Sequence, residues 1–343
     1  MKQVIGWSIA LTVAMVGSYL TWTDDSEPPA VEGVAVYRAS PAELGSVTWA
    51  SEKTTVTLTK RSDDLGDYYW LDSLEVRTIT RPVEPAEPDE STPEDAPPEP
   101  ATEEVTEEVR VSFLGNAAAA QVWDGFAPLE ALRELTELPG IDREVFGLTE
   151  PEGTLTVKKG DASYEIVVGS ETYGSKDRYA AMGDRVFLLD DADLRPLQFA
   201  SSRLVERQLT PLQSTDMERM TASLPGGPSV ELVQGNRDDE ARAFWALASS
   251  PDEADDDAEA WVARAFQLRF RRYVRDEEAG ELAPLFSYAV EGGGQTYEVS
   301  FFMSETDGHA YARSSHNRSL LQLTDDTAPV VQEALTQLAA SGG

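Results

Sequence analysis

The 343-residue sequence has no cysteine and only two histidines. The absence of cysteine excludes a disulfide framework, thiolate metal sites, a cysteine nucleophile and a lipid anchor carried by a cysteine. Basic residues are scarce as well, because 28 lysines and arginines stand against 62 acids and give a net charge of −34. A surface of this sign repels phosphate backbones and anionic lipid headgroups, so we expect no nucleic-acid partner.

Ionisable side chains are missing from one long N-terminal run, "VIGWSIALTVAMVGSYLTW", which extends from Val4 to Trp22. A helix of this length spans roughly the 30 Å hydrocarbon core of a bilayer. Because Lys2 precedes the run and acids follow it, we expect a transmembrane anchor over residues 1–23. This places a single-pass protein in the inner (cytoplasmic) membrane, with the bulk of the chain outside the cytoplasm. The alternative is a signal peptide cleaved before Tyr19, which would give a secreted protein.

Proline and acidic residues dominate two further segments. Residues 24–42 are typical of a short stalk. The second segment, residues 82–108, has seven prolines, eleven acids and no base. It cannot bury enough apolar surface to offset its chain entropy, so we expect it to be disordered and extended. Removing its eleven charges from −34 leaves −23, so the acidity is a general property of the chain.

An internal repeat is visible in the remaining sequence. The stretch "SYEIVVGSETYGSKDRYAAMGDRVFLLDD" (163–191) aligns with "TYEVSFFMSETDGHAYARSSHNRSLLQLTDD" (296–326). Upstream, residues 46–71 resemble residues 219–247. The matched pairs are mainly apolar or aromatic: Tyr164 with Tyr297, Tyr179 with Tyr311, Leu188 with Leu321, and Leu189 with Gln322. Alternating positions of this kind indicate half-buried strands.

The repeat predicts an α+β fold with mainly antiparallel strands packed with helices. We expect a first repeat over 43–212, interrupted by the acidic insert, and a second repeat over 213–343. In the first repeat, "RYAAMGDRVFLL" predicts a hairpin with its turn at Gly183-Asp184.

Helical patterns lie between and after the strands of each copy. Residues 127–138 place four leucines on one face, and residues 250–275 carry apolar residues at i+4 spacing. The acids of the second stretch fill its first turns and its arginines the last, which complements a helix dipole. Each copy should close with a further helix, over 191–200 and over 327–340.

Several of these motifs resemble a known family, the domain of unknown function 4340 (DUF4340). The resemblance is carried by "YYWL", "FAPLEALREL", "IDREVFGLTEPEGTLTV" and "IVVGSETYGSKDRYAAMGDRVFLLDDADLRPL". It covers residues 43–212 well and the second copy weakly, and the acidic insert departs from the family pattern. The resemblance implies a membrane-anchored bacterial envelope protein, in some cases associated with gliding-motility-type ABC transporters. It implies no catalytic residues.

Five polar residues could carry chemistry in the hairpin regions. Lys176 would need a desolvating pocket or a nearby cation to act as a nucleophile, but it is followed by an acid on an expected loop. His309 and His316 lie near Ser314 and Ser315, a composition found in hydrolases. A nucleophile–base pair also needs an orienting group, and no elbow motif is present. We interpret all of these residues as exposed turn residues.

Other charged or glycine-rich stretches have equally simple interpretations. The acids of 252–259 lack the glycine and ligand spacing of a calcium loop, so we expect a solvated helix start. The arginines of 269–275 could bind an anionic partner, but a helix end paired with nearby acids is the simpler interpretation. The glycines of 291–295 lack the Lys-Ser/Thr of a phosphate loop and indicate a turn. We assign no catalytic, cofactor-binding or metal-ligating residue.

These observations favour a non-catalytic envelope protein that acts as an accessory or interaction module of a larger complex, with a protein partner. Two alternatives remain open: a binder of cell-wall glycan or a small ligand between the repeats, and a hydrolase. A pocket lined by polar side chains of both repeats would favour the ligand binder. A serine, a histidine and an acid within hydrogen-bond reach would favour the hydrolase.

Overall fold

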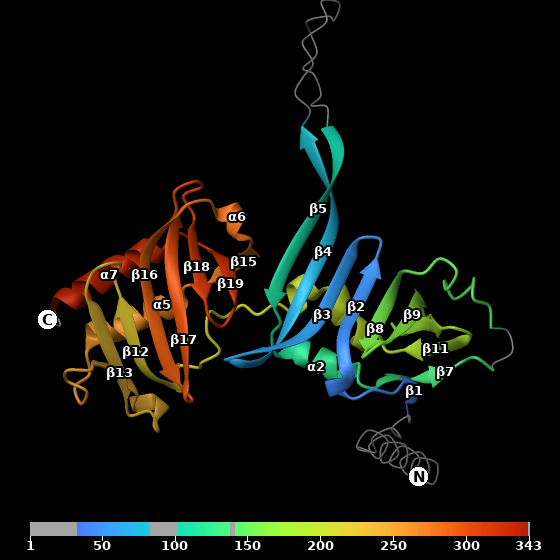
Figure 1. The fold of residues 1–343 in the computed structure, drawn as a ribbon, viewed down its shortest axis with the longest axis horizontal. Helices are drawn as coiled ribbons and strands as arrows, with labels where there is room; N and C mark the ends of the chain where they lie inside the picture. Colours follow the sequence, from blue (N-terminus) through green and yellow to red (C-terminus); the bar gives the residue numbers. More distant parts are fainter. Residues whose placement is uncertain (1–32, 83–101, 138–140, 342–343) are drawn as a thin grey trace, which may run out of the picture.

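A computed structural model describes residues 33–82, 102–137 and 141–341. Two large antiparallel sheets lie side by side, one formed by the first half of the chain and the other by the second half (Figure 1). Helices cover each sheet, so the fold is α+β, as the sequence predicted. The connection between the two units runs from Leu204 to Asp216.

In the described residues, the first unit contains a nine-stranded sheet and three helices. In spatial order its strands are β5 (Thr102–Leu114), β4 (Gly66–Pro82), β3 (Thr54–Asp63), β2 (Leu44–Ser51), β8 (Gly153–Lys159), β9 (Ala162–Glu171), β10 (Arg178–Met182), β11 (Arg185–Leu189) and β7 (Arg133–Glu134). The short strands β1 (Val34–Tyr37) and β6 (Leu129–Ala131) pair separately, and a 3₁₀ turn covers Pro41–Glu43. The helices are α2 (Ala117–Gly125), α3 (Asp191–Gln198) and α4 (Ala200–Arg203).

The second unit contains an eight-stranded sheet. In spatial order its strands are β14 (Phe244–Leu247), β13 (Ser229–Gly235), β12 (Met217–Ser223), β16 (Leu282–Gly292), β17 (Gln295–Ser304), β18 (Ala310–Ser314), β19 (Ser319–Leu323) and β15 (Phe270–Val274). Its helices are α5 (Asp256–Gln267), α6 (Asp276–Ala279) and α7 (Ala328–Ser341), with a 3₁₀ turn at Glu240–Arg242. Helices α5 and α7 pack against each other beside the sheet.

The two sheets share one topology. Apart from β5, the first sheet has the order β4-β3-β2, then β8-β9-β10-β11, then β7, and the second has the order β14-β13-β12, then β16-β17-β18-β19, then β15. In both sheets the last strand follows a helix in the chain. This is the arrangement that an internal repeat predicts, and the first unit adds β5 as an extra edge strand. The register of the last hairpin differs from the sequence alignment by one residue, because Tyr179 pairs with Leu188 whereas Tyr311 pairs with Gln322.

One buried tryptophan anchors a helix in each unit. Trp123 of α2 and Trp261 of α5 are both 1% exposed. The Trp123 indole donates to the carbonyl oxygen of Pro41, and the Trp261 indole donates to that of Val331 in α7. Each indole therefore contributes a large buried area while its N–H remains paired. The apolar core is continuous through both units.

Two predicted helices are wrong in extent or type. Residues 129–131 and 133–134 form strands β6 and β7, and the helix of this region is α2, which lies upstream. Leu129 and Ala131 are buried while Glu130 is exposed, which is the two-residue period of a strand. The pairing of β6 with β1 satisfies this backbone, and the leucine spacing alone could not reveal that partner.

The second predicted helix is too long, because α5 ends at Gln267. Phe270 and Val274 belong to strand β15, where they pair with Leu323 and Leu320 of β19. The closing helices α3 and α7 and the hairpin of β10 and β11 confirm the other predictions. The turn between β16 and β17 falls at Gly293-Gly294, as expected, and both residues have positive φ.

The acidic insert is shorter than predicted. Residues 102–108 form the first part of β5 and pair with residues 76–82 of β4, so the expectation of disorder is wrong there. Val105 and Val109 lie on the same face of the strand and supply apolar positions for it, and the backbone of β4 supplies the pairing partner. The rest of the insert lies outside the described residues.

The predicted anchor also lies outside the described residues, as does most of the predicted stalk. Over the ranges that the structure covers, no helix has the length and apolar character needed to cross a bilayer.

Candidate functional site

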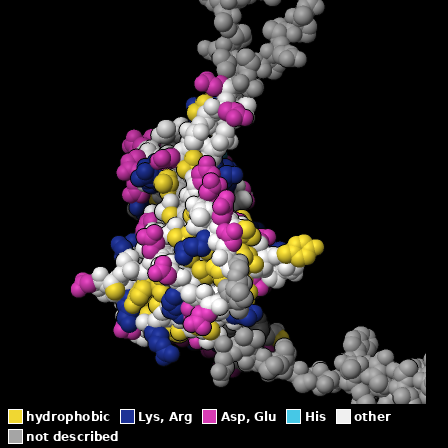
Figure 2. All heavy atoms as spheres, turned by 90° about the vertical axis from the view of Figure 1, so that its right-hand side faces the viewer, with side chains coloured by type: hydrophobic (Ala, Val, Ile, Leu, Met, Phe, Trp, Pro, Cys, Tyr) yellow, Lys and Arg dark blue, Asp and Glu magenta, His cyan; other side chains and the backbone are white. Residues whose placement is uncertain are grey.

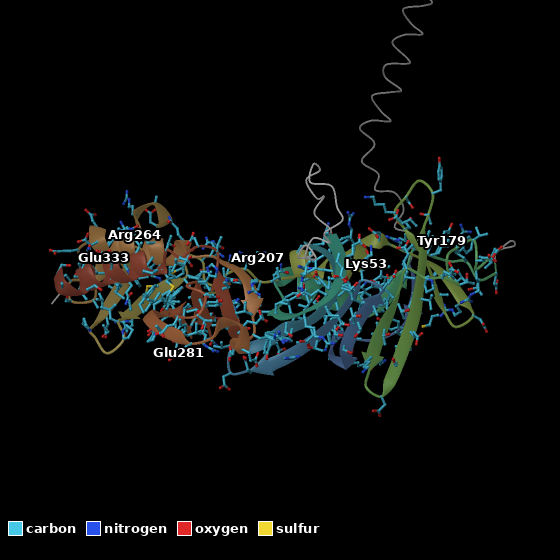
Figure 3. The ribbon with its side chains drawn as sticks, turned by 90° about the horizontal axis from the view of Figure 1, so that it is seen from above. Lys53, Tyr179, Arg207, Arg264, Glu281 and Glu333 are labelled. Atoms are coloured by element: carbon cyan, nitrogen blue, oxygen red, sulfur yellow. The ribbon has the colours of Figure 1, made fainter. Side chains whose placement is uncertain are left out.

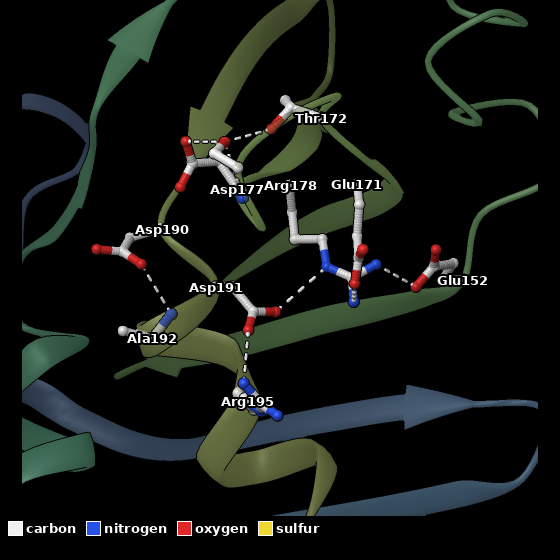
Figure 4. A network of polar contacts seen from close by, with 10 residues as sticks. Glu152, Glu171, Thr172, Asp177, Arg178, Asp190, Asp191, Ala192 and Arg195 are labelled. Carbon is white, nitrogen blue, oxygen red and sulfur yellow. Dashed lines mark hydrogen bonds and ion pairs between the residues drawn. The ribbon is translucent and has the colours of Figure 1, made fainter.

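The most concentrated polar network lies where β10 begins (Figure 4). The side chain of Arg178 has an exposed fraction of only 9%, and its guanidinium contacts three carboxylates, those of Glu152, Glu171 and Asp191. Its Nη2 lies 3.0 Å from Glu171 Oε1, and its Nε lies 3.3 Å from Asp191 Oδ1. Asp191 is the first residue of α3, so the network ties the start of a strand to the start of a helix.

This network has a structural character. A guanidinium keeps its charge at every accessible pH, and its donors are directed to carboxylates rather than to open space. Lys176 lies two residues upstream and is exposed, while the Ser175 hydroxyl donates to Asp177 within the loop. The loop is therefore polar and open, as the sequence predicted, but Arg178 itself is buried. Sequence reasoning missed it because its carboxylate partners are far apart in the chain.

The histidines and serines of the hydrolase alternative do not form a triad. The Ser314 hydroxyl is buried and donates to the carbonyl oxygen of Leu209 at 2.5 Å, and the Ser315 hydroxyl accepts from the Glu298 amide. His309 is exposed, and its Nδ1 lies 3.7 Å from Asp326. The serine hydroxyls therefore serve as structural partners of the backbone.

His316 is not the exposed turn residue that the sequence predicted. Its Nε2 is buried without a hydrogen-bond partner among the described residues. Burial, together with the nearby charge of Arg318, lowers the pKa of His316 from 6.5 to about 4. An imidazole that stays neutral down to this pH in a tight turn is a packing group, because a general base works best near the operating pH.

The acidic and arginine-rich stretches are engaged in local structure. Asp255 caps α5 by accepting from the Ala258 amide, and Glu259 accepts from the Trp245 amide. Glu278 forms ion pairs with Arg272 and Arg275. Over residues 33–82, 102–137 and 141–341, no group of three or more histidines and acids is arranged to hold a metal.

The turn between β18 and β19 joins the two units. Arg318 forms a two-point ion pair with Asp63 of the first unit, and its guanidinium lies 3.9 Å from the centre of the Tyr68 ring. The fully buried Asn317 donates to the Tyr273 hydroxyl at 3.0 Å, which in turn donates to the carbonyl oxygen of Glu206 in the connection. Polar contacts of this kind fix how the second unit lies against the first.

A two-stranded ribbon projects from the first sheet (Figure 1). Strand pairing with β3 ends at Glu75, although the Val76 amide still donates to the carbonyl oxygen of Lys53, and in the strand ladder residues 76–82 of β4 face residues 102–108 of β5 alone. The exposed acids of this ribbon are Glu103, Glu104, Glu107 and Glu108. Figure 2 shows acidic side chains along the projecting part of the molecule.

The two faces of the ribbon differ in charge. On one face, Arg77 lies opposite Glu107 and Arg81 lies opposite Glu103. Side chains alternate between faces along a strand, so Glu104 and Glu108 fall on the other face, together with threonines and Val76. Arg110, just beyond the ribbon on this same face, forms an ion pair with Glu108. The ribbon therefore presents one face of mixed charge and one face on which acids outnumber bases.

A cavity of about 590 Å³ lies below the connection between the units. It is lined by the connection, by α5, by Trp245 of β14 and by Tyr288 of β16. Its lining therefore comes from the connection and the second unit, not from the strands of both sheets as the ligand-binding alternative required.

Comparison with known families identifies one match. The model of the family described as Domain of unknown function (DUF4340) matches residues 120–284, and the predicted family is thereby confirmed. The match begins within α2 and ends in β16, so it starts later than the resemblance over 43–212 suggested and reaches into the second unit. Neither the curated proteins nor the solved structures yield a match to this chain.

Proposed function

We propose that this protein is a non-catalytic interaction module of the cell envelope and that its β4–β5 ribbon docks a protein partner. The observation that carries the proposal is the ribbon itself. Two strands pair with each other over residues 76–82 and 102–108, with no third strand of the described chain beside them. An isolated two-stranded ribbon is marginally stable in water, and its outer edges leave backbone donors and acceptors without strand partners.

A strand added to an outer edge of the ribbon would pair with the backbone donors and acceptors that lack strand partners. Extended segments bind sheet edges in this way in many protein complexes, where main-chain hydrogen bonds supply affinity and alternate side chains supply specificity. The exposed acids of the ribbon complement a basic partner segment, and charge complementarity of this kind sets specificity and association rate. The partner that fits is therefore an extended, basic segment of another envelope protein.

The envelope location is part of the same proposal. It is supported by the apolar run Val4–Trp22, which is long enough to span a bilayer, and by Lys2 before it. The family resemblance implies membrane-anchored envelope proteins, some of them associated with ABC transporters of gliding-motility type. A membrane tether would hold the ribbon at a limited distance from other membrane proteins and so raise their effective concentration.

Site-specific photocrosslinking in the producing cells tests this function. A benzoylphenylalanine residue replaces Thr106 of the ribbon, and the control carries it at Thr336, which is exposed on α7. We expect one discrete adduct from Thr106, weaker when cells are lysed into high salt before irradiation, and none from Thr336. Equal adducts from both positions, or none from either, would contradict docking through the ribbon.

A further inference from the structure

The cavity below the connection has the properties of a ligand site that the ribbon function does not use. Its volume of about 590 Å³ lies within the usual range of small-molecule pockets, roughly 300–1,000 Å³. Its apolar surface comes from Leu209, Leu212, Met217, Trp245, Val262 and Phe266. Three segments that are distant in the sequence therefore converge on one apolar space.

Two arginines line the same cavity. Arg269 follows the end of α5, and its Nη1 donates to the carbonyl oxygens of Phe266 and Leu268. Arg207 comes from the connection and lies at the junction of the units (Figure 3). Neither guanidinium forms an ion pair with a carboxylate of the described residues.

What sets these two arginines apart is their place in the cavity lining, because other described arginines, such as Arg264 and Arg271, also form no ion pair but do not line the cavity. In the whole chain acids outnumber bases by 62 to 28. One carboxylate, that of Glu259, also lines the cavity, but it accepts a hydrogen bond from the Trp245 amide. The two arginines therefore leave positive charge beside an apolar space in an otherwise acidic molecule.

The hydroxyl of Tyr288 adds a polar group to the cavity wall. Tyr288 is 2% exposed, and its ring stacks on Phe266 with centroids 5.7 Å apart. Its hydroxyl has no hydrogen bond to any residue that the structure describes, and it is not one of the fully buried polar atoms, so a molecule in the cavity can reach it. Burial raises the pKa of this hydroxyl, so it stays protonated and can donate to a ligand oxygen.

We propose that this cavity binds a small amphipathic anion: an apolar body that fills the space between α5 and the connection, with one acidic head group held by Arg207 and Arg269. A carboxylate or a phosphate head would satisfy the guanidinium donors equally well. The lining excludes a polar sugar chain as the preferred ligand, because most of its surface could not hydrogen-bond to hydroxyl groups. This site does not rest on the ribbon function.

Titration calorimetry on the full chain in zwitterionic nanodiscs, with empty nanodiscs subtracted, tests the site. The probes are octanoate and octyl phosphate, which share one chain length and differ in head group, and 1-octanol as the neutral control. We expect saturable binding of one anion per chain, and at least tenfold weaker binding of 1-octanol. Stronger binding of octanoate indicates a carboxylate ligand, and stronger binding of octyl phosphate indicates a phosphate ligand.

Three variants locate the binding. Arg207→Gln with Arg269→Gln should weaken the better anion at least tenfold, whereas Arg264→Gln on the exposed face of α5 should change nothing (Figure 3). Ala263→Trp places an indole at the exposed edge of the lining and should abolish binding even if the arginine variant fails to fold. Absence of saturable binding by either anion, equal binding of 1-octanol, or unchanged affinity in the Ala263→Trp chain would overturn the proposal.

Discussion

Replacing Phe187 with alanine should destabilise the first unit more than any change in the neighbouring charged loop. Phe187 lies in the middle of β11, pairs with Ala180 of β10 and Glu134 of β7, and has no exposed surface. A buried aromatic ring removes roughly 150–200 Å² from water, which at about 25 cal/mol per Å² corresponds to about 4–5 kcal/mol. Phenylalanine-to-alanine changes in protein cores cost about 3–5 kcal/mol, so we expect a loss of about 4 kcal/mol.

Urea unfolding measures this loss. For a unit of this size the free energy of unfolding falls by about 2 kcal/mol per molar urea, so the midpoint should drop by about 2 M. The control, Lys176→Ala, removes an exposed side chain and should shift the midpoint by less than about 0.3 M. The interpretation of this hairpin as structural is refuted if Phe187→Ala is tolerated while Lys176→Ala folds normally and abolishes complementation of a deletion strain.

Acid should weaken the fold through His316, because its pKa of about 4 in the folded state lies below the unfolded value near 6.5. Its contribution is complete above pH 6.5 and is lost as the pH falls toward 4, so His316→Gln should flatten the dependence of the melting temperature on pH in this window. Asp193 should act in the opposite direction, since burial raises its pKa to about 6, and Asp193→Asn should stabilise the protein at pH 7 but not at pH 4. Arg318→Ala should cost about 1–2 kcal/mol through its ion pair and its contact with a tyrosine ring, and a double-mutant cycle with Asp63→Asn should show coupling. Alkaline phosphatase fused after Gly343 should be active if the chain is exported, and an inactive enzyme there with a working cytoplasmic reporter would refute the topology.

The repeat could be predicted from the sequence because half-buried strands leave a local record. Tyr164 and Tyr297 occupy the third positions of β9 and β17, and alternating apolar residues follow each of them. Turn residues gave the hairpin boundaries equally well, since Gly183 and the glycines at 293–294 adopt the positive φ that favours glycine. Features that depend on one local element could therefore be predicted from the sequence.

Features that depend on partners distant in the chain could not be predicted from the sequence alone. Leu129 and Leu135 fit a helical stripe, but β1 and β11 supply backbone partners that turned their segment into strands. The buried position of Arg178 likewise depends on three carboxylates from separate elements. The ribbon did leave a signal in "TEEVTEEVRVSFL", where apolar residues recur at even spacing, but the acidic composition concealed it.

The most direct test of the docking function compares two deletions that differ only in the ribbon. In the first, residues 77–107 are replaced by Asn-Gly, which joins the opposed residues Val76 and Glu108 in a two-residue turn. In the second, only residues 83–101 are replaced by Asn-Gly, and the ribbon is kept. Both chains should unfold cooperatively with nearly unchanged melting temperatures, because few ribbon side chains are buried.

Native electrophoresis of envelope extracts then reports whether each chain is in its complex. We expect the chain without the ribbon to migrate alone and to fail to complement a deletion strain, whereas the chain that keeps the ribbon should retain the complex. A folded chain without residues 77–107 that still migrates in the complex would contradict the proposal that the ribbon binds the partner.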